Sequence, residues 1–590
     1  MAAVARTGHA QEPTAVSLTA TLSDSAYVYG DASSRTLGAG IEYNEKEPVA
    51  TSRTTDAQNV PPVIPPDHEA RTLIVCFDGT GDQFDNDNSN IVQLVSLLKK
   101  DDRTKQLVYY QAGIGTYTSP KVATPFMSSI RKTLDVMFAW NLNAHVMSGY
   151  EFLMQHYITG DKICIFGFSR GAYTARSLAG MLHKVGLLPA GNFQQVPFAY
   201  KMYARADEIG WEQSTEFKKA FAVDVPIEFI GVWDTVDSVG IIPKRLPFTT
   251  SNTIVRTFRH AVSLDERRAK FKANLWNRPN KVELKLGTDI ATSTPNPEVP
   301  AARPTSFDEP VEKREQPHKP TNGKSNKYTP NLKLPKPTGP PKEDEDDRML
   351  NTFERKYSEK QAKTTDIEEV WFAGCHSDIG GGSVSNKTRH SLARITLRWM
   401  VRECFKTNTG ILFNSAALRD IGIDPSTLYP TIAPRPPQLP IGTHGIRNPP
   451  AKPIPIRPHA FLRKKSQPHP DVQTLLEAAR TPFLGSEEEE ELHDILSPKY
   501  DQLSLKKFWW VLEVLPLRLR YQRGDNEWVS YFGSNMGQPR YIPKQRTNGF
   551  KVHRSVKMRM EADYEDEVRR RKGKKYHPKP HFKVEPTWID

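Results

Sequence analysis

The chain has 590 residues, including 47 prolines, and carries a formal net charge of +13. A chain of this length can hold more than one domain, but the many prolines indicate that a large part of it lies outside any packed core. The longest strongly apolar run, residues 508–517, is interrupted by Glu513 and Pro516 and is too short to span a bilayer. We therefore expect no transmembrane segment.

The distribution of charge and the cysteine content indicate which kinds of partner and which cellular location to expect. Much of the positive charge lies in expected linkers and in the run at 569–575, which is typical of a solvated tail, so nucleic-acid binding is not expected. The four cysteines are Cys76, Cys164, Cys375 and Cys404, and no C-x-x-C pair occurs. We expect buried free thiols rather than a disulfide or a metal site, which favours a reducing, cytoplasmic location.

The first half of the chain alternates strands and helices. Strands are expected at residues 73–77, 106–111, 163–166 and 227–233, and helices at about 142–157 and 171–184. A further helical segment is expected after Asn252, and it carries His260 beside a cluster of charged residues. Helices and buried strands in alternation are typical of a parallel sheet that helices cover on both faces.

The second half resumes this pattern after a stretch rich in proline and lysine. A strand is expected at 367–373, a helix at 392–405, an aromatic helix at 505–515 and a strand at 528–532. The aromatic stretch Phe508–Val511 is interpreted as part of a core helix, and a lid or a lipid-facing anchor is the alternative.

Composition divides the chain into ordered and low-complexity parts. The expected division is a disordered tail at 1–68, a catalytic domain in two parts at 69–276 and 366–431, a disordered insertion at 277–365, a Pro-rich linker at 432–470, a C-terminal part of the catalytic domain or an appended subdomain at 471–565, and a basic tail at 566–590. The tail at 1–68 also lacks the apolar stretch of a secretory signal.

The pentapeptide GFSRG at 167–171 is the most informative motif of the chain. It joins the strand expected at 163–166 to the helix that follows, which is the context of a nucleophile elbow. Side chains in place of the two glycines would crowd the turn, which must hold Ser169 in a strained backbone conformation. The motif predicts an α/β-hydrolase-like fold, with a doubly wound and mainly parallel sheet, and Ser169 as the nucleophile.

A serine hydroxyl needs a base that takes its proton and a carboxylate that orients the base. In α/β-hydrolases the order along the chain is serine, acid, histidine. Asp234, at the end of the strand expected at 227–233, and His376, in a glycine-flanked loop after a later strand, follow Ser169 in that order. Three residues remain as alternatives, Asp378 and Asp237 for the acid and His260 for the base.

The oxyanion that forms during acyl transfer needs backbone N–H donors. The N–H of Arg170 is one candidate, and Gly79 or Thr80, in the turn after the first strand, supplies the second. This Asp-Gly-Thr turn also resembles a phosphatase loop, but Cys76 stands where that chemistry requires its nucleophilic aspartate. No metal-binding motif occurs, and we expect neither a metal nor a cofactor.

Four separated motifs resemble a known family. They are FDGT at 77–80, GFSRGAYTAR at 167–176, GVWDTV at 231–236 and HSDIGGG at 376–382. In this order they resemble the catalytic domain of the type VI secretion lipase effectors of the first class, a family found in fungi as well as bacteria. The resemblance extends over about residues 70–275 and 366–405.

This resemblance implies an α/β-hydrolase fold and a serine esterase or phospholipase activity on glycerophospholipids. Residue by residue, it implies Ser169, Asp234 and His376 as the triad. The insertion at 277–365 departs from the family by separating the acid from the histidine, and no segment resembles a secretion adaptor. The bacterial toxin role is therefore not carried over.

We expect a serine hydrolase that cleaves carboxyl esters, with acyl esters or phospholipids as substrates and with peripheral membrane contact. The alternative is a catalytically inactive scaffold of the same fold. Such a scaffold would bind protein partners through its Pro-rich segments, for example as P-x-x-P ligands.

Overall fold

The structure of the protein is a computed structural model. It describes residues 60–80, 82–113, 142–236, 245–278, 285–286, 342–343, 345–358, 364–442, 444–447, 483–522, 528–543, 549–564 and 575–590. All of these residues belong to one compact unit, Ala57–Asp590.

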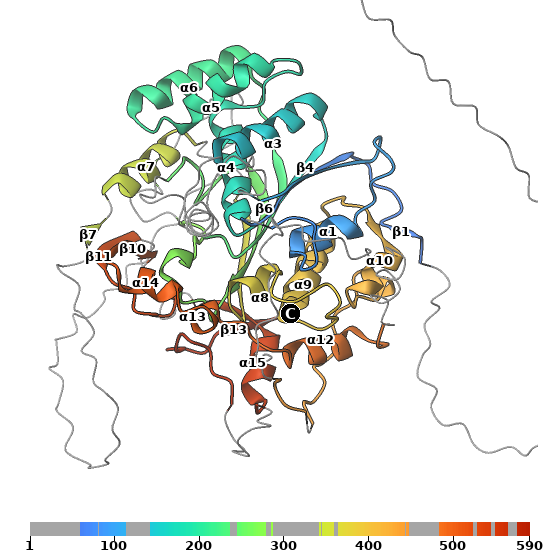
Figure 1. Ribbon diagram of the computed structural model, residues 1–590. Helices are drawn as coiled ribbons and strands as arrows, with labels where there is room; N and C mark the ends of the chain where they lie inside the picture. Colours follow the sequence, from blue (N-terminus) through green and yellow to red (C-terminus); the bar gives the residue numbers. More distant parts are fainter. Residues whose placement is uncertain are drawn as a thin grey trace, which may run out of the picture. The chain divides into compact units, whose positions relative to one another are not determined.

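A parallel sheet forms the centre of this unit (Figure 1). The described residues contribute eight strands to it, and every neighbouring pair is parallel. Their order is β13 (Thr587–Ile589), β12 (Lys551–His553), β8 (Asp366–Phe372), β6 (Val255–Ser263), β5 (Ile227–Trp233), β4 (Lys162–Phe168), β2 (Thr72–Phe77) and β3 (Gln106–Gln111).

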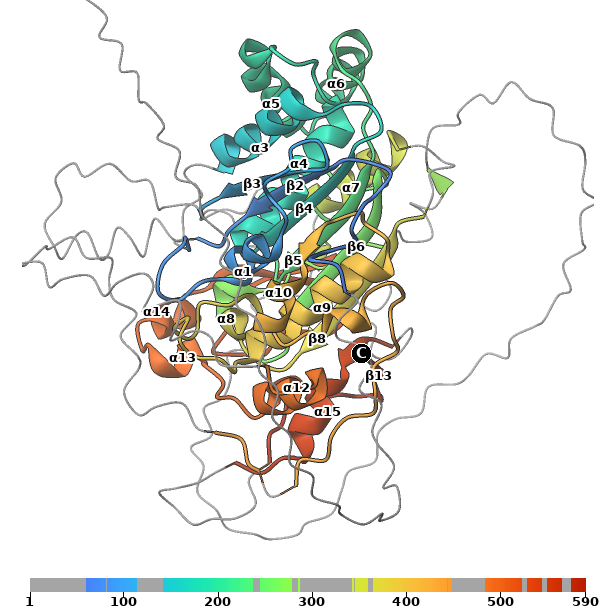
Figure 2. The same ribbon diagram turned by 90° about the vertical axis from the view of Figure 1, so that its right-hand side faces the viewer.

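Helices cover both faces of the sheet (Figure 2). One face carries α3 (Leu142–His156), α4 (Arg170–Val185), α5 (Val196–Ala204) and α6 (Glu208–Phe221), and the other carries α1 (Asn90–Leu97), α9 (Leu392–Lys406) and α10 (Ser415–Asp420). Side chains of β2 alternate between the two cores, with Leu73, Val75 and Phe77 in the first and Ile74 and Cys76 in the second. This alternation explains why the strand is apolar at almost every position.

The remaining elements lie around the sheet. The strands are β1 (Val63–Ile64), which pairs with β9 (Phe413–Asn414), and β7 (Lys342–Glu343), β10 (Leu517–Gln522) and β11 (Trp528–Gly533), which form a small sheet. The helices are α7 (Glu345–Lys356), α8 (His376–Gly380), α12 (Glu487–Ile495), α13 (Gln502–Leu505), α14 (Trp509–Val514) and α15 (Arg554–Glu561). Short 3₁₀ turns are η1 (Phe193–Gln195), η2 (Ala269–Phe271) and η4 (Pro425–Thr427).

The segment after Asn252 differs from its prediction. It was expected to be helical, but it forms β6, a strand between β5 and β8. The helix prediction was wrong because Arg259 and His260 look like exposed residues in the sequence. Both are buried, and their partners are carboxylates, Glu403 for Arg259 and Glu369 for His260.

Stretches that composition assigned to tails or to the insertion contain ordered elements. Strand β1 lies within 1–68 and buries Ile64, and α7 lies within 277–365. Strand β13 lies within 566–590 and forms an edge of the central sheet. Each of these elements is short, so the composition of a long window conceals it.

The aromatic segment of the C-terminal part also differs from its prediction. Residues 505–515 do not form one helix, because α13 ends at Leu505 and α14 begins at Trp509. The core interpretation of Phe508–Val511 is wrong, since Phe508, Trp510 and Val511 are exposed.

All four cysteines are buried and free, as predicted. In the described part of the chain, no helix combines the length and the apolar character that a membrane span needs.

Candidate active site

Ser169 lies where β4 ends and α4 begins. Its backbone angles, φ 58° and ψ −120°, are strained for a residue with a side chain, and such strain costs about 1–3 kcal/mol. The flanking glycines make the turn possible. A Cβ on Gly167 would lie 2.6 Å from Ala172 Cα, and one on Gly171 would collide with two carbonyl oxygens at the end of β2. Ser169 is thus held at the tip of a tight strand-to-helix turn.

Two short hydrogen bonds connect Ser169, His376 and Asp234. The distance from His376 Nδ1 to Asp234 Oδ2 is 2.6 Å, and that from His376 Nε2 to Ser169 Oγ is 2.7 Å. A carboxylate can only accept, so Nδ1 carries the proton and Nε2 accepts from the serine hydroxyl. This is the tautomer that a general base requires.

The fold brings these residues together from separate strands. Ser169 follows β4, Asp234 follows the adjacent β5, and His376 begins α8 after β8. The carboxyl ends of parallel strands meet at one edge of a sheet, which is where such folds place their sites. Asp234 also has a positive φ, 43°, at the turn that ends its strand.

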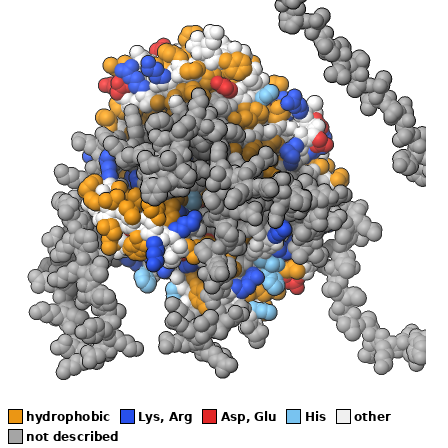
Figure 3. All heavy atoms as spheres, in the orientation of Figure 1, with side chains coloured by type: hydrophobic (Ala, Val, Ile, Leu, Met, Phe, Trp, Pro, Cys, Tyr) orange, Lys and Arg blue, Asp and Glu red, His pale blue; other side chains and the backbone are white. Residues whose placement is uncertain are grey.

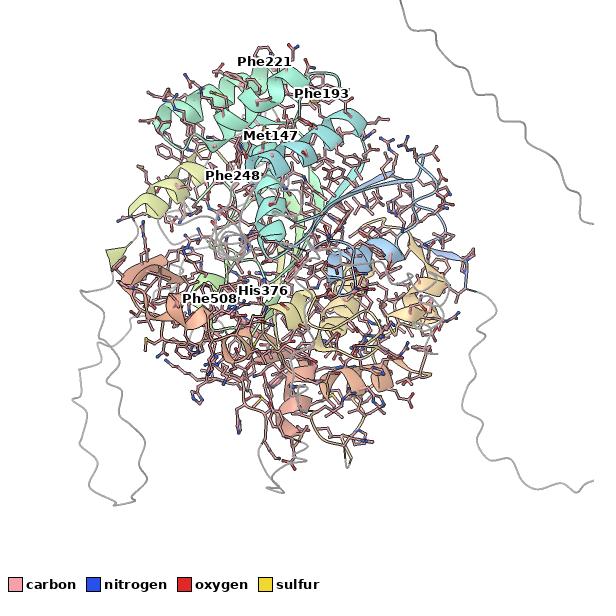
Figure 4. All side chains as sticks on the ribbon, in the orientation of Figure 1. Met147, Phe193, Phe221, Phe248, His376 and Phe508 are labelled. Carbon is pink, nitrogen blue, oxygen red and sulfur yellow. The ribbon has the colours of Figure 1, made fainter. Side chains whose placement is uncertain are left out.

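Two aromatic rings enclose the imidazole of His376, which is labelled in Figure 4. Phe168 stacks on it with ring centroids 4.8 Å apart, and Phe271 meets it edge to face at 4.8 Å. Burial lowers the pKa of His376, and although Asp234 opposes this, the pKa stays below its ordinary value. The imidazole is therefore neutral at neutral pH and able to accept a proton.

Asp234 has a partner that the sequence did not reveal, Arg540. Arg540 Nη1 donates to Asp234 Oδ1 at 2.5 Å, and Nη2 donates to Oδ2 at 3.0 Å. Ser263 adds a backbone N–H at 2.8 Å from Oδ1. Burial alone would raise the pKa of Asp234, but Arg540 and the bond to His376 outweigh it and hold that pKa well below the usual range. Asp234 is therefore a charged carboxylate.

A second buried ion pair lies beside His376. Arg268 donates to both carboxylate oxygens of Glu266 at 2.9 Å, and Glu266 Oε2 accepts from the His376 backbone N–H at 3.2 Å. Burial opposes the charge of Glu266, but Arg268 lowers its pKa overall. The Arg268 guanidinium also lies 3.5 Å above the ring of Phe271. This pair fixes the start of α8 and one wall of the site.

The alternative acid Asp378 does not contact the imidazole through any described hydrogen bond. Its carboxylate accepts from the backbone N–H groups of Cys375 and Tyr500, at 2.9 and 3.0 Å, and from Ser383 Oγ at 3.1 Å. Burial raises the pKa of Asp378 to about 6, although these bonds oppose the shift. Asp378 thus caps α8 and anchors the neighbouring loop. The other alternative acid, Asp237, lies outside the described residues.

The alternative base His260 lies on β6 and faces other partners. Its Nε2 accepts from the Thr235 backbone N–H at 3.0 Å, and its Nδ1 donates to Glu369 at 3.0 Å. Both ring nitrogens are therefore occupied. Burial lowers the pKa of His260, so the ring is a neutral support for the turn after Asp234.

Two of the expected oxyanion donors, Arg170 and Gly79, lie next to the turn that holds Ser169. Arg170 is the first residue of α4, and Gly79 lies against Phe168, since a Cβ on Gly79 would be 2.8 Å from that ring. The N–H of Gly79 already donates to the Asp78 carboxylate at 2.8 Å. Thr80 Oγ1 is buried and has no hydrogen-bond partner in the part of the chain that is described. Gly79 thus uses its N–H for the bond to Asp78, whereas the Thr80 hydroxyl has no partner among the described residues.

Among the described residues, no group of three or more His, Cys, Asp and Glu side chains is placed to hold a metal ion.

Residues 71–403 match the T6SS phospholipase effector Tle1-like catalytic domain, which is more than half of the chain. The chain belongs to this family. Membership supports a hydrolase function of the lipase or phospholipase kind. The Tle1-like match includes Ser169, Asp234 and His376 and ends before Arg540.

A curated relative is the uncharacterized protein YEL023C of Saccharomyces cerevisiae. It is 30% identical over 556 residues, which cover 84% of this chain and 79% of the relative.

Two solved structures are more distant. The crystal structure of an uncharacterized protein from Pseudomonas aeruginosa has 15% identity and a TM-score of 0.27, and the match covers 58% of this chain and 46% of that one. The Tle1 effector bound to the VgrG spike has 19% identity and a TM-score of 0.21, with 39% and 53% covered. The chain thus spans about half of the length of each solved protein.

Proposed function

We propose that the protein is a serine hydrolase that cleaves the acyl esters of glycerophospholipids. The observation that carries the proposal is the hydrogen-bonded series from Asp234 through His376 to Ser169, with the serine in a strained turn. Membership of the Tle1-like family supports phospholipids as the substrate class.

In the proposed reaction, Ser169 Oγ forms a bond to the acyl carbonyl carbon while its proton moves to His376 Nε2. Asp234 keeps the proton on Nδ1 and stabilises the imidazolium. The imidazolium then gives its proton to the leaving lysophospholipid oxygen as the ester bond breaks. Water repeats the sequence on the acyl-enzyme, and a fatty acid leaves.

The charge on the carbonyl oxygen during both steps needs donors. We assign this role to the backbone N–H of Arg170, at the positive end of α4, together with Thr80. Gly79 is the weaker candidate because its N–H is committed to Asp78.

The test is mass spectrometry of lipid products from purified protein and mixed phospholipid vesicles. Wild type should release lysophospholipid and fatty acid, and Ser169→Ala should release neither above the rate without enzyme. Ser177→Ala is the matched control, because Ser177 is a buried serine of α4, the helix that follows Ser169, and its hydroxyl donates to the backbone carbonyl of Tyr173. It should keep the activity.

Equal product formation by Ser169→Ala and wild type would overturn the proposal. A folded wild type without products on any lipid class would instead favour the inactive scaffold.

A further inference from the structure

The segment around α14 presents apolar side chains to solvent. The side chains of Phe508, Trp510, Val511, Val514 and Leu515 are exposed, between 38% and 57% each, and we call this set the α14 face. Figure 3 shows hydrophobic side chains gathered over this region, and Figure 4 labels Phe508 there. Contiguous exposed apolar surface of this kind is uncommon and marks an interaction site.

A buried glutamate holds α14 in this orientation. Glu513 is fully buried, and its carboxylate accepts from the Ala269 N–H at 2.6 Å, from the Asn535 amide at 2.5 Å and from the Gly537 N–H at 2.9 Å. The only acid of the helix thus points inward, while Trp510, Val511 and Val514 are exposed. This is the reverse of an ordinary surface helix, in which the apolar face is the one that is buried.

The exposed charges within the segment that carries the α14 face are all positive. Between residues 506 and 518 the charged side chains are Lys506, Lys507, Glu513 and Arg518, and the three basic ones are exposed. An apolar surface bordered by lysine and arginine matches a bilayer that contains anionic lipids, since the apolar side chains enter the headgroup region and the cations contact phosphates.

Aromatic contacts connect this segment to the site. Trp509, on the inner side of α14, meets the ring of Phe271 edge to face at 5.5 Å, and Phe271 meets His376 at 4.8 Å. Arg268 lies over both rings, with its guanidinium 4.8 Å from the Trp509 centroid. Only one aromatic residue therefore separates the inner side of the α14 segment from the imidazole.

We propose that the α14 face docks on the surface of a bilayer that contains anionic phospholipid and brings Ser169 to its lipid substrate. The inference rests on the proposed function and names the surface on which that function operates. The occupant is a bilayer because the exposed set combines aromatic and aliphatic side chains with a border of one charge sign, next to a site of a phospholipase-like family.

The experiment compares wild type with Val511→Asp/Val514→Asp, which places two carboxylates on the α14 face. Binding is measured by co-sedimentation with phosphatidylcholine vesicles that contain one of two amounts of phosphatidylserine, none or about a fifth. Activity is measured on the same vesicles and on a monomeric short-chain ester in solution. Phe221→Asp, at an equally exposed aromatic residue at the end of α6, is the matched control.

Wild type should bind the anionic vesicles more tightly, and added salt should weaken the binding. The double variant should lose about tenfold or more in vesicle binding and in vesicle hydrolysis, and its activity on the monomeric ester should stay within about twofold. Phe221→Asp should match wild type in all three readouts. Retained activity on the monomeric ester shows that the double variant is folded.

Equal vesicle binding by wild type and the double variant would overturn the docking surface. So would a wild type that dimerises through this face, detected as a concentration-dependent dimer in sedimentation that the double variant abolishes. Absence of esterase activity on both substrates would overturn the proposed function instead, because vesicle binding is measured without catalysis.

Discussion

Arg540→Gln is the substitution that most sharply tests the electrostatics of the site. Arg540 and His376 share the oxygen Oδ2 of Asp234, at 3.0 and 2.6 Å. The positive guanidinium therefore opposes protonation of the imidazole through space. Glutamine keeps much of the side-chain volume and removes the charge, so the pKa of His376 should rise.

The size of this rise follows from the shared oxygen. The two bonds place the guanidinium and imidazole nitrogens within about 6 Å, where two unit charges interact by about 3 kcal/mol at an effective dielectric constant of about 20. That energy corresponds to about two pK units, and relaxation of the site reduces it, so we expect a rise of about one to two units. Arg268 and Glu266 are unchanged in this variant, so their effects on the pKa of His376 stay the same.

The assay is the pH dependence of kcat/KM on a monomeric ester. In wild type the pKa of His376 lies below its ordinary value, so activity should persist below neutral pH. In Arg540→Gln the acid limb should move up by about one to two pH units, with activity recovering above pH 8. Arg540→Lys keeps the charge and should move the limb by less than about half a unit.

The buried carboxylate also loses its ion-pair partner, which should lower the free energy of unfolding by about 3–5 kcal/mol. Arg559→Gln is the control for this loss, because Arg559 is fully buried but donates to the carbonyl oxygens of Ile495 and Ser497. It should lower stability and leave the acid limb in place. A pH profile for Arg540→Gln that superimposes on that of wild type would show that Arg540 does not influence the pKa of His376.

Three further predictions concern the acid, a buried histidine and the turn. Asp234→Asn should lower kcat by about 10⁴ and Asp378→Asn by less than about tenfold, since only Asp234 orients the imidazole; comparable losses in steady-state assays would contradict this assignment. Burial lowers the pKa of His183 to about 3, so the unfolded state takes up the proton first. The free energy of unfolding should then fall by about 1.4 kcal/mol per pH unit between about pH 6.5 and pH 3, and denaturant titrations of His183→Gln should show a smaller fall over this range. Gly171→Ala should lower the melting temperature and the activity together, because its Cβ would collide with backbone carbonyls, and an unchanged melting temperature would count against the turn geometry.

Local patterns in the sequence predicted most of the central sheet. Continuous apolar runs with a glycine or an aspartate at their ends predicted β2, β4 and β5, because a strand covered on both faces has few polar positions. The strand-turn-helix context then predicted the strained position of Ser169, and the chain order of acid and base predicted which residues meet it.

The features that the sequence did not predict depend on contacts between residues that are far apart along the chain. Arg540 is separated from Asp234 by 306 positions, and no local motif marks an arginine that pairs with a carboxylate so far away. Strand β6 was taken for a helix because its arginine and histidine are buried only through ion pairs with other elements. The exposure of the α14 face depends on the hydrogen bonds that Glu513 accepts from Ala269, Asn535 and Gly537, which lie outside the helix.

In the proposed mechanism, Ser169 is an activated nucleophile. The most direct measurement is labelling of the folded protein with a fluorophosphonate, followed by peptide mass spectrometry to locate the adduct. We expect one adduct, on Ser169, formed by wild type and abolished in His376→Ala, because the hydroxyl reacts only when Nε2 takes its proton. A folded wild type that stays unlabelled, or Ser169→Ala protein that labels as fast as wild type, would contradict it.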